Sequence, residues 1–206
     1  EKAINYKKTK INDNYFETKD KFSCYGCTAC ANICPKGAIK MVEDEDGFTY
    51  PEIDEEKCIK CGLCEKTCIY KNEKIIDKNK LKKVFAIYSN DSKVREESSS
   101  GGAFTGLYTD IIKNGGYVIG VKYDNKMNVV YDIATTLDEC KKFRGAKYVR
   151  ANNDEIYPKI KEKLETDKPV LVTGTPCFIA GLKAYLNRDY ANLITMDIIC
   201  HGTPSQ

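Results

Sequence analysis

The sequence predicts two successive domains of different class, a small α+β domain followed by an α/β domain with a partial, mixed or parallel sheet. Three observations predict this division. A four-cysteine pattern occurs twice between residues 24 and 68, a polar, lysine-rich stretch follows it, and residues 168–202 have the pattern of strand, turn, helix and strand. We expect a lead-in over residues 1–20, the cysteine-rich domain over 21–75, a linker over 76–83 and the α/β domain over 84–206.

Composition limits the classes of protein to which the chain can belong. Its 206 residues are 42% hydrophobic, which is enough to bury a core. The net charge of +3 is too small and too evenly spread to indicate a nucleic-acid-binding surface. No stretch approaches the roughly 18 apolar residues that span a bilayer, and the first ten residues lack the apolar core of a signal peptide. We therefore expect a cytoplasmic protein with no nucleic-acid partner and no membrane span.

The 11 cysteines indicate metal or redox chemistry, because a reducing cytosol does not sustain a disulfide framework. In the repeated pattern, a tight Cys-x-x-Cys-x-x-Cys loop can wrap three iron corners of a cubane cluster, and the fourth corner needs a remote thiolate. In two-cluster ferredoxins the late cysteine of each run ligates the other cluster. We therefore expect one 4Fe-4S cluster on Cys24, Cys27, Cys30 and Cys68, and a second on Cys58, Cys61, Cys64 and Cys34.

Structural zinc is the alternative for these cysteines, but zinc favours two separated Cys-x-x-Cys pairs. The sequence between the two runs supports a ferredoxin, since residues 37–41 and 48–53 have the pattern of short strands around a turn. Together these features resemble the bacterial-type dicluster ferredoxins across about residues 21–72, and they imply an α+β ferredoxin-like dicluster domain. One departure is that Pro35 follows the first run whereas Ile69 follows the second, which alters the local hydrogen bonding that tunes potential.

The α/β domain is expected to begin with a strand over residues 84–89. Residues 98–102 form a serine and glycine cluster that opens a helix, whose apolar side chains recur at helical spacing until residues 114–116 end it. Small residues at a helix N-terminus expose backbone N–H groups, so this cluster is either a pyrophosphate cradle or an ordinary N-cap. Two strands over residues 116–124 and 128–134 follow. A short amphipathic segment then contains Cys140, which we interpret as a core cysteine.

Residues 168–202 have the pattern of a βαβ unit with parallel, neighbouring strands. Such a unit places residues 174–177 and 200–202 at the carboxyl edge of the sheet, where open α/β sheets bind ligands. Thr175 suits the N-cap and Pro176 the first helical position. Cys177 would then lie in the first turn, where the helix dipole favours a thiolate.

Cys200 is expected close to Cys177. The two thiols could be cluster ligands, a redox dithiol or unrelated core cysteines, and the sequence alone leaves these alternatives open. His201, the single histidine, either donates protons to a cofactor or hydrogen-bonds backbone.

Four motifs in order, "SSSGGAFTGL", "KFRGAKYV", "VTGTPCFIAGLKAYL" and "DIICHGTPS", resemble the coenzyme F420 hydrogenase/dehydrogenase beta-subunit family over about residues 84–206. The resemblance implies a fold that holds FAD beside a further 4Fe-4S cluster and that passes electrons between reduced deazaflavin, coenzyme F420, and the iron-sulfur chain. The cofactor-binding positions that it implies are Ser99, Ser100, Gly101, Gly102, Arg144, Gly145, Lys147, Tyr148, Thr173, Gly174, Thr175, Pro176 and His201.

The same resemblance makes Cys177 and Cys200 candidate ligands of a third 4Fe-4S cluster, which a downstream Cys-x-x-Cys completes in relatives. Arg144 and Lys147 suit a cofactor phosphate or a reduced flavin, and their alternative is a surface ion pair. The sequence ends at Gln206, before that downstream motif, so we expect an incomplete α/β domain.

These features favour an oxidoreductase subunit in which a flavin exchanges a hydride and divides the electron pair between the clusters. No side chain is assigned as catalytic, because the cofactors supply the chemistry. The expected partner is a redox protein or a hydrogenase/dehydrogenase catalytic subunit, and the cluster chemistry favours an anaerobic host. One alternative is a ferredoxin-type electron carrier whose α/β part is a docking module, and another is a structural iron-sulfur protein.

Overall fold

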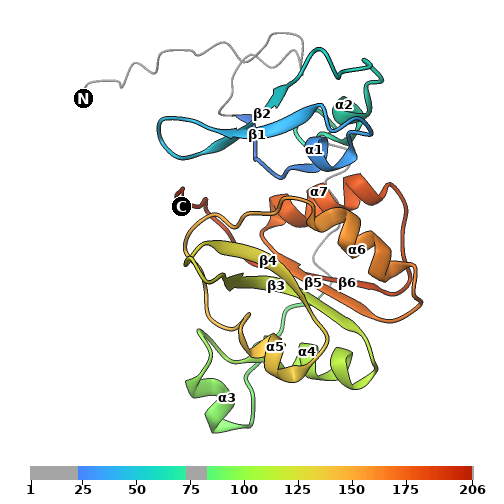
Figure 1. Ribbon diagram of the computed structural model, residues 1–206. Helices are drawn as coiled ribbons and strands as arrows, with labels where there is room; N and C mark the ends of the chain where they lie inside the picture. The colour runs from blue at the N-terminus through green and yellow to red at the C-terminus, as the bar shows by residue number, and fades with distance from the viewer. Residues whose placement is uncertain (1–22, 73–82, 206) are drawn as a thin grey trace.

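The computed structural model describes residues 23–72 and 83–205, which form two stacked groups of elements (Figure 1). The predicted lead-in over 1–20 and most of the predicted linker over 76–83 lie outside the described residues. The smaller group is a β-hairpin flanked by two short helices. The larger group is a four-stranded sheet with helices on both faces. Within the described residues, no helix combines the length and apolar character needed to cross a bilayer.

The cysteine-rich part is built as a repeat. Its two helices each begin after a residue with left-handed backbone, Thr28 at φ 61° and Gly62 at φ 71°, and each ends at a cysteine. The two strands pair antiparallel with Ile39 opposite Ile53, which confirms the predicted hairpin. In chain order the elements are α1 (Ala29–Ile33), β1 (Ile39–Glu43), β2 (Thr49–Ile53) and α2 (Leu63–Thr67).

The larger part is an α/β fold with a mixed sheet of order β4-β3-β5-β6. Strand β3 pairs antiparallel with β4 and parallel with β5, and β5 pairs parallel with β6, so the predicted βαβ unit is confirmed. The elements are α3 (Ser92–Glu96), α4 (Ala103–Lys113), β3 (Tyr117–Tyr123), β4 (Val129–Ala134), α5 (Leu137–Lys141), α6 (Ile156–Leu164), β5 (Val170–Gly174), α7 (Pro176–Leu186) and β6 (Leu193–Asp197).

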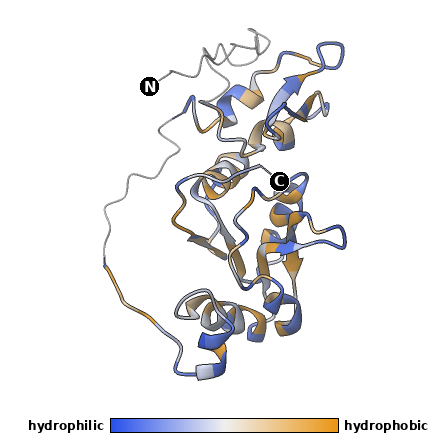
Figure 2. Cartoon of the chain, turned by 90° about the vertical axis from the view of Figure 1, so that its left-hand side faces the viewer, coloured by the Kyte–Doolittle hydropathy of each residue, from blue (hydrophilic) through white to orange (hydrophobic). Residues whose placement is uncertain are grey.

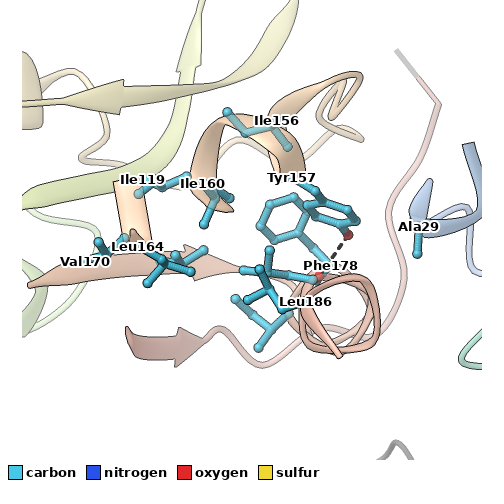
Figure 3. Packing of buried hydrophobic residues seen from close by; sticks show 12 residues of the cluster. Ala29, Ile119, Ile156, Tyr157, Ile160, Leu164, Val170, Phe178 and Leu186 are labelled. Carbon is cyan, nitrogen blue, oxygen red and sulfur yellow. Dashed lines mark hydrogen bonds between the residues drawn. The ribbon is translucent and has the colours of Figure 1, made fainter. Parts of the chain in front are cut away.

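Alternation along β5 divides the core between the two faces of the sheet. Val170 and Val172 face α6 and α7 and pack in the main core, whereas Leu171 faces α4 and α5 in a second cluster. Figure 3 shows the main core, in which Phe178 from α7 lies beside the α6 side chains. Ala29 of α1 belongs to this same cluster, so the cysteine-rich part contributes to the core of the α/β part.

Cys140 on α5 is fully buried in the second cluster, which confirms its interpretation as a core cysteine. Burial raises the pKa of its thiol from 9.0 to about 11, because the thiolate would lose its hydration there. A rise of about two units leaves about a hundredfold less thiolate near pH 8. We expect iodoacetamide to modify Cys140 far more slowly in the folded protein than in urea, as measured by peptide mass spectrometry. Equal rates would contradict its burial.

The predicted strand over residues 84–89 is wrong. This segment forms no strand, and its apolar side chains Val84, Phe85 and Tyr88 are between 68% and 79% exposed. Figure 2 shows it as an extended, partly orange trace standing apart from the sheet. β-branched and aromatic residues favour strands only where a neighbouring strand supplies hydrogen-bonding partners. In the described sheets, residues 84–89 pair with no strand.

Candidate metal centre and cofactor edge

The two cysteine loops have the same backbone. In the first, the N–H of Gly26 donates to Cys24 Sγ at 3.3 Å, and in the second the N–H of Lys60 donates to Cys58 Sγ at 3.4 Å. Gly26 and Lys60 both have positive φ, at 57° and 53°. This conformation turns amide groups toward the sulfur atoms, as a loop that wraps an anionic cluster requires.

The late cysteine of each run returns toward the other run. Cys34 and Cys68 end α1 and α2, which contact each other, and both pack with Cys64 against the small core of Cys30 and Ile39. The N–H of Ala38 donates to Cys34 Sγ at 3.3 Å. Among the described residues, no group of three or more metal-binding side chains is compact enough to hold a single ion. The amide-to-sulfur bonds and the crossed runs fit two 4Fe-4S clusters, whose thiolates are spread over separate iron corners.

The first loop is the more deeply buried of the two. Burial raises the pKa of Cys27 to about 12 and also raises the pKa of Cys24. Cys68 and Cys177 lie close enough to both thiols to raise these pKa values further through charge repulsion. Two thiols of raised pKa beside further cysteines need a cation to become thiolates together, which is the environment of an iron-sulfur ligand set.

Helix α7 begins as predicted, with Thr175 as N-cap and Pro176 in the first turn. The Thr175 side chain does not cap the helix backbone, and its Oγ1 instead lies 3.2 Å from Cys177 Sγ. Because Cys177 lies near Cys24 and Cys27, the carboxyl edge of the sheet faces the first cysteine run. Sequence reasoning placed Cys177 at this edge with Cys200 as its expected neighbour, but it did not predict the proximity of Cys24 and Cys27.

Three side chains that sequence reasoning missed hold the first loop against the α/β part. Asn153 Nδ2 donates to the Cys27 carbonyl at 3.1 Å. The Tyr157 hydroxyl lies 2.8 Å from the same oxygen and 2.9 Å from the Phe178 carbonyl, and Figure 3 shows the second of these bonds. The Arg150 guanidinium donates to the Gly26 carbonyl. The only sequence signal was the apolar spacing of α6, at residues 156, 160 and 164.

Helix α7 approaches the first loop through Gly181. A Cβ at this position would lie 2.7 Å from Tyr157 Oη and 3.0 Å from Cys27 Sγ, closer than side chains pack. Glycine therefore permits the contact between α7 and the cysteine loop. Helix α1 touches both α6 and α7, and Figure 1 shows it directly above them.

The structure brings together two of the segments predicted to bind cofactor. Ser99 Oγ accepts a hydrogen bond from the Ala146 N–H at 3.0 Å, which joins the loop before α4 to the segment after α5. Arg144 pairs with Glu97 at 2.5 Å, and its side chain is 12% exposed, so this is not the surface ion pair that was its alternative role. Lys147 Nζ donates to the Arg144 carbonyl at 2.8 Å, and burial lowers the pKa of this amine.

The N-terminus of α4 has the features of the predicted cradle. Its N-cap is Gly102 at φ 81°, and no side chain caps the helix. A short turn joins the end of α4 to the start of β3, so the helix runs back along the strand. The N-terminus of α4 therefore lies toward the carboxyl end of β3, the edge that also carries Gly174. Ser100 and Tyr148 are exposed, whereas Gly101 and Gly145 are close to Tyr88 and Ser99 respectively.

The remaining predicted residues lie on β5 and on the segment after β6. Thr173 Oγ1 donates to the Ile119 carbonyl at 3.1 Å, a structural bond within the sheet. Cys200 and His201 are exposed on the segment after β6. The N–H of Gly202 donates to Cys200 Sγ at 3.4 Å, the same two-residue spacing that Cys24 and Cys58 show.

Comparison with known proteins gives two family matches. Residues 23–72 match the 4Fe-4S dicluster domain, and residues 84–156 match the N-terminal domain of the coenzyme F420 hydrogenase/dehydrogenase beta subunit. Among solved structures, a chain of the F420-reducing NiFe hydrogenase complex from Methanosarcina barkeri is 23% identical with a TM-score of 0.48, over 57% of this chain and 44% of that chain.

Curated relatives match over shorter lengths. An uncharacterized ferredoxin of Methanocaldococcus jannaschii is 39% identical over 49 residues, which are 24% of this chain and 62% of that protein. One component of an ion-translocating oxidoreductase complex from Methanosarcina acetivorans is 44% identical over 45 residues, 22% of this chain and 15% of that protein. This chain thus spans less than two thirds of either relative. Its residues 23–72 are therefore similar to a 4Fe-4S dicluster domain, and its residues 84–156 are similar to the N-terminal domain of the coenzyme F420 hydrogenase/dehydrogenase beta subunit.

Proposed function

We propose that this chain belongs to an electron-transferring oxidoreductase subunit with two 4Fe-4S clusters and FAD. The observation that carries the proposal is the burial of the first cysteine loop against the start of α7, with Cys177 beside Cys24 and Cys27. This contact supports the proposal because Cys24 and Cys27, the proposed iron-sulfur ligands, lie toward the carboxyl edge of the sheet, where α/β proteins hold cofactors. A docking module alone would not need this edge to face the clusters.

In this proposal, eight cysteines would hold the two clusters. Cys24, Cys27, Cys30 and Cys68 would hold the buried cluster, and Cys58, Cys61, Cys64 and Cys34 would hold the exposed one. When bound, the flavin supplies two-electron chemistry with a soluble donor, and the clusters accept single electrons. The chain excludes water from the first loop through Ala29, Asn153 and Tyr157, all of which are buried.

The FAD site is proposed at the N-terminus of α4. Its uncapped helix end suits a pyrophosphate, and residues 98–102 and 144–148 meet there. By the same family resemblance, we propose Cys177 and Cys200 as two of the four ligands of a third 4Fe-4S cluster; the remaining cysteines of this chain supply no further ligand, so about eight irons are still expected from this chain alone. A deazaflavin of the coenzyme F420 type is the proposed donor, and a hydrogenase or dehydrogenase catalytic subunit is the proposed partner.

Arg144→Gln is expected to weaken FAD binding about tenfold, because it removes a cation at the proposed phosphate site. The measurement is the dissociation constant of FAD by fluorescence titration. Arg188→Gln is the matched control, since Arg188 forms a comparable ion pair with Glu165 on the surface beyond α7. Equal FAD affinity in both variants would remove Arg144 from the site.

Anaerobic purification followed by iron, sulfide and flavin analysis tests the whole proposal. About eight irons and one FAD per chain are expected. About eight irons without flavin after reconstitution would instead support the ferredoxin-type carrier. Stoichiometric zinc would contradict both functions.

A further inference from the structure

The two cysteine loops share their cysteine spacing and backbone conformation, but the helices that follow them differ in burial. In the first loop Thr28 is 3% exposed and Ala29 is fully buried against α6 and α7. In the second loop the residue equivalent to Ala29 is Leu63, which is 38% exposed. Two clusters in equivalent loops would therefore experience different solvation.

Solvation affects reduction, because a cluster becomes more negative when it accepts an electron. Burial withholds the water that would stabilise the added charge, so burial alone lowers the reduction potential. A fixed positive charge nearby acts in the opposite direction and raises it. The first loop has such a charge on the α/β part.

That charge belongs to Arg150, whose guanidinium donates to the Gly26 carbonyl and lies 3.5 Å from the Tyr25 carbonyl. The backbone N–H of Arg150 donates to the Pro204 carbonyl at 3.1 Å, which anchors the residue from the other side. Gly26 has no side chain, and a Cβ at this position would overlap the guanidinium. The loop is thus shaped to receive this arginine.

In the second loop the residue equivalent to Gly26 is Lys60, whose side chain is exposed. Solvent and salt screen an exposed charge, so Lys60 has a weaker effect on its own cluster.

We propose that Arg150 is a positioning residue that raises the reduction potential of the cluster held by Cys24, Cys27, Cys30 and Cys68. This inference rests on the two clusters of the proposed function. Packing against the α/β part buries that cluster, which lowers its reduction potential. Arg150 offsets this effect, so the potential of the buried cluster moves toward that of the exposed cluster. The residue acts across the contact between the two parts of the chain.

The test is a potentiometric titration of the full chain under anaerobic conditions, monitored by electron paramagnetic resonance. Arg150→Gln is expected to lower one of the two midpoint potentials by about 59 mV, which is a tenfold change for a one-electron couple. The other midpoint stays in place. Arg150→Met is a second neutral variant for the case in which Arg150→Gln loses a cluster, and it is expected to produce the same shift. Arg150→Lys retains the charge and is expected to restore most of the potential.

Lys60→Gln is the matched control and is expected to leave the midpoint potential of the buried cluster unchanged. A purely structural role for Arg150 predicts the opposite sign, because undocking would admit water and raise the potential. A positive shift or unmoved midpoints in the Arg150 variants that retain both clusters would overturn this inference alone. A wild-type chain without iron would overturn the proposed function, and this inference with it.

Discussion

Serine in place of Cys61 is expected to remove one 4Fe-4S cluster, so that iron falls from about eight to about four atoms per chain. A hydroxyl is a poor replacement for a thiolate ligand. Cys61 is exposed in the second loop, whereas Ala29 after the first loop is buried in the core formed by α6 and α7. The α/β elements should therefore keep their circular dichroism and melting temperature.

The matched control is Cys140→Ser, since Cys140 lies in the core and not in either cysteine run. This variant is expected to keep about eight irons while losing some stability. Loss of both clusters together with unfolding of the α/β elements in Cys61→Ser would contradict the expectation that the second cluster can be lost while the α/β part stays folded.

Alanine in place of Phe178 is expected to lower the free energy of unfolding by about 3–5 kcal/mol, the usual cost of such a truncation in a packed core. Phe178 is 2% exposed and stacks on Tyr131 with ring centroids 3.8 Å apart. It also lies against Tyr157, at 5.1 Å between centroids, next to the first cysteine loop. Urea denaturation monitored by circular dichroism measures the change.

Phe85→Ala provides the matched truncation on the surface. Phe85 is 71% exposed, so its removal is expected to change stability by less than about 0.5 kcal/mol. If Phe178→Ala cost no more than Phe85→Ala, the aromatic cluster between Tyr131 and Tyr157 would not support the core.

Local patterns predicted most of the elements. The hairpin β1–β2, helix α4, strands β3 and β4, and the unit from β5 to β6 all carry their own periodicity and end signals. The Thr175-Pro176 start of α7 followed from the residues that favour the first helical turn. Short-range physical chemistry determines these features, so a single sequence contains enough information to predict them.

The errors and omissions concern long-range contacts. Residues 84–89 have strand-like composition, but strand formation depends on a partner that the sequence does not name. The contacts of Arg150, Asn153 and Tyr157 with the loop at Gly26 and Cys27 join positions more than 120 residues apart. The motif "KFRGAKYV" ends directly before Arg150, and none of the quoted motifs includes these three residues. The cluster assignments and flavin contacts stay predictions, which the variants above test.

The most direct measurement of the central claim is the iron and acid-labile sulfide content of the anaerobically purified chain, combined with its Mössbauer spectrum. The account predicts about eight irons and about eight sulfides per chain, with the spectrum of two 4Fe-4S clusters. A correctly folded chain that binds no iron, even after reconstitution, would contradict it.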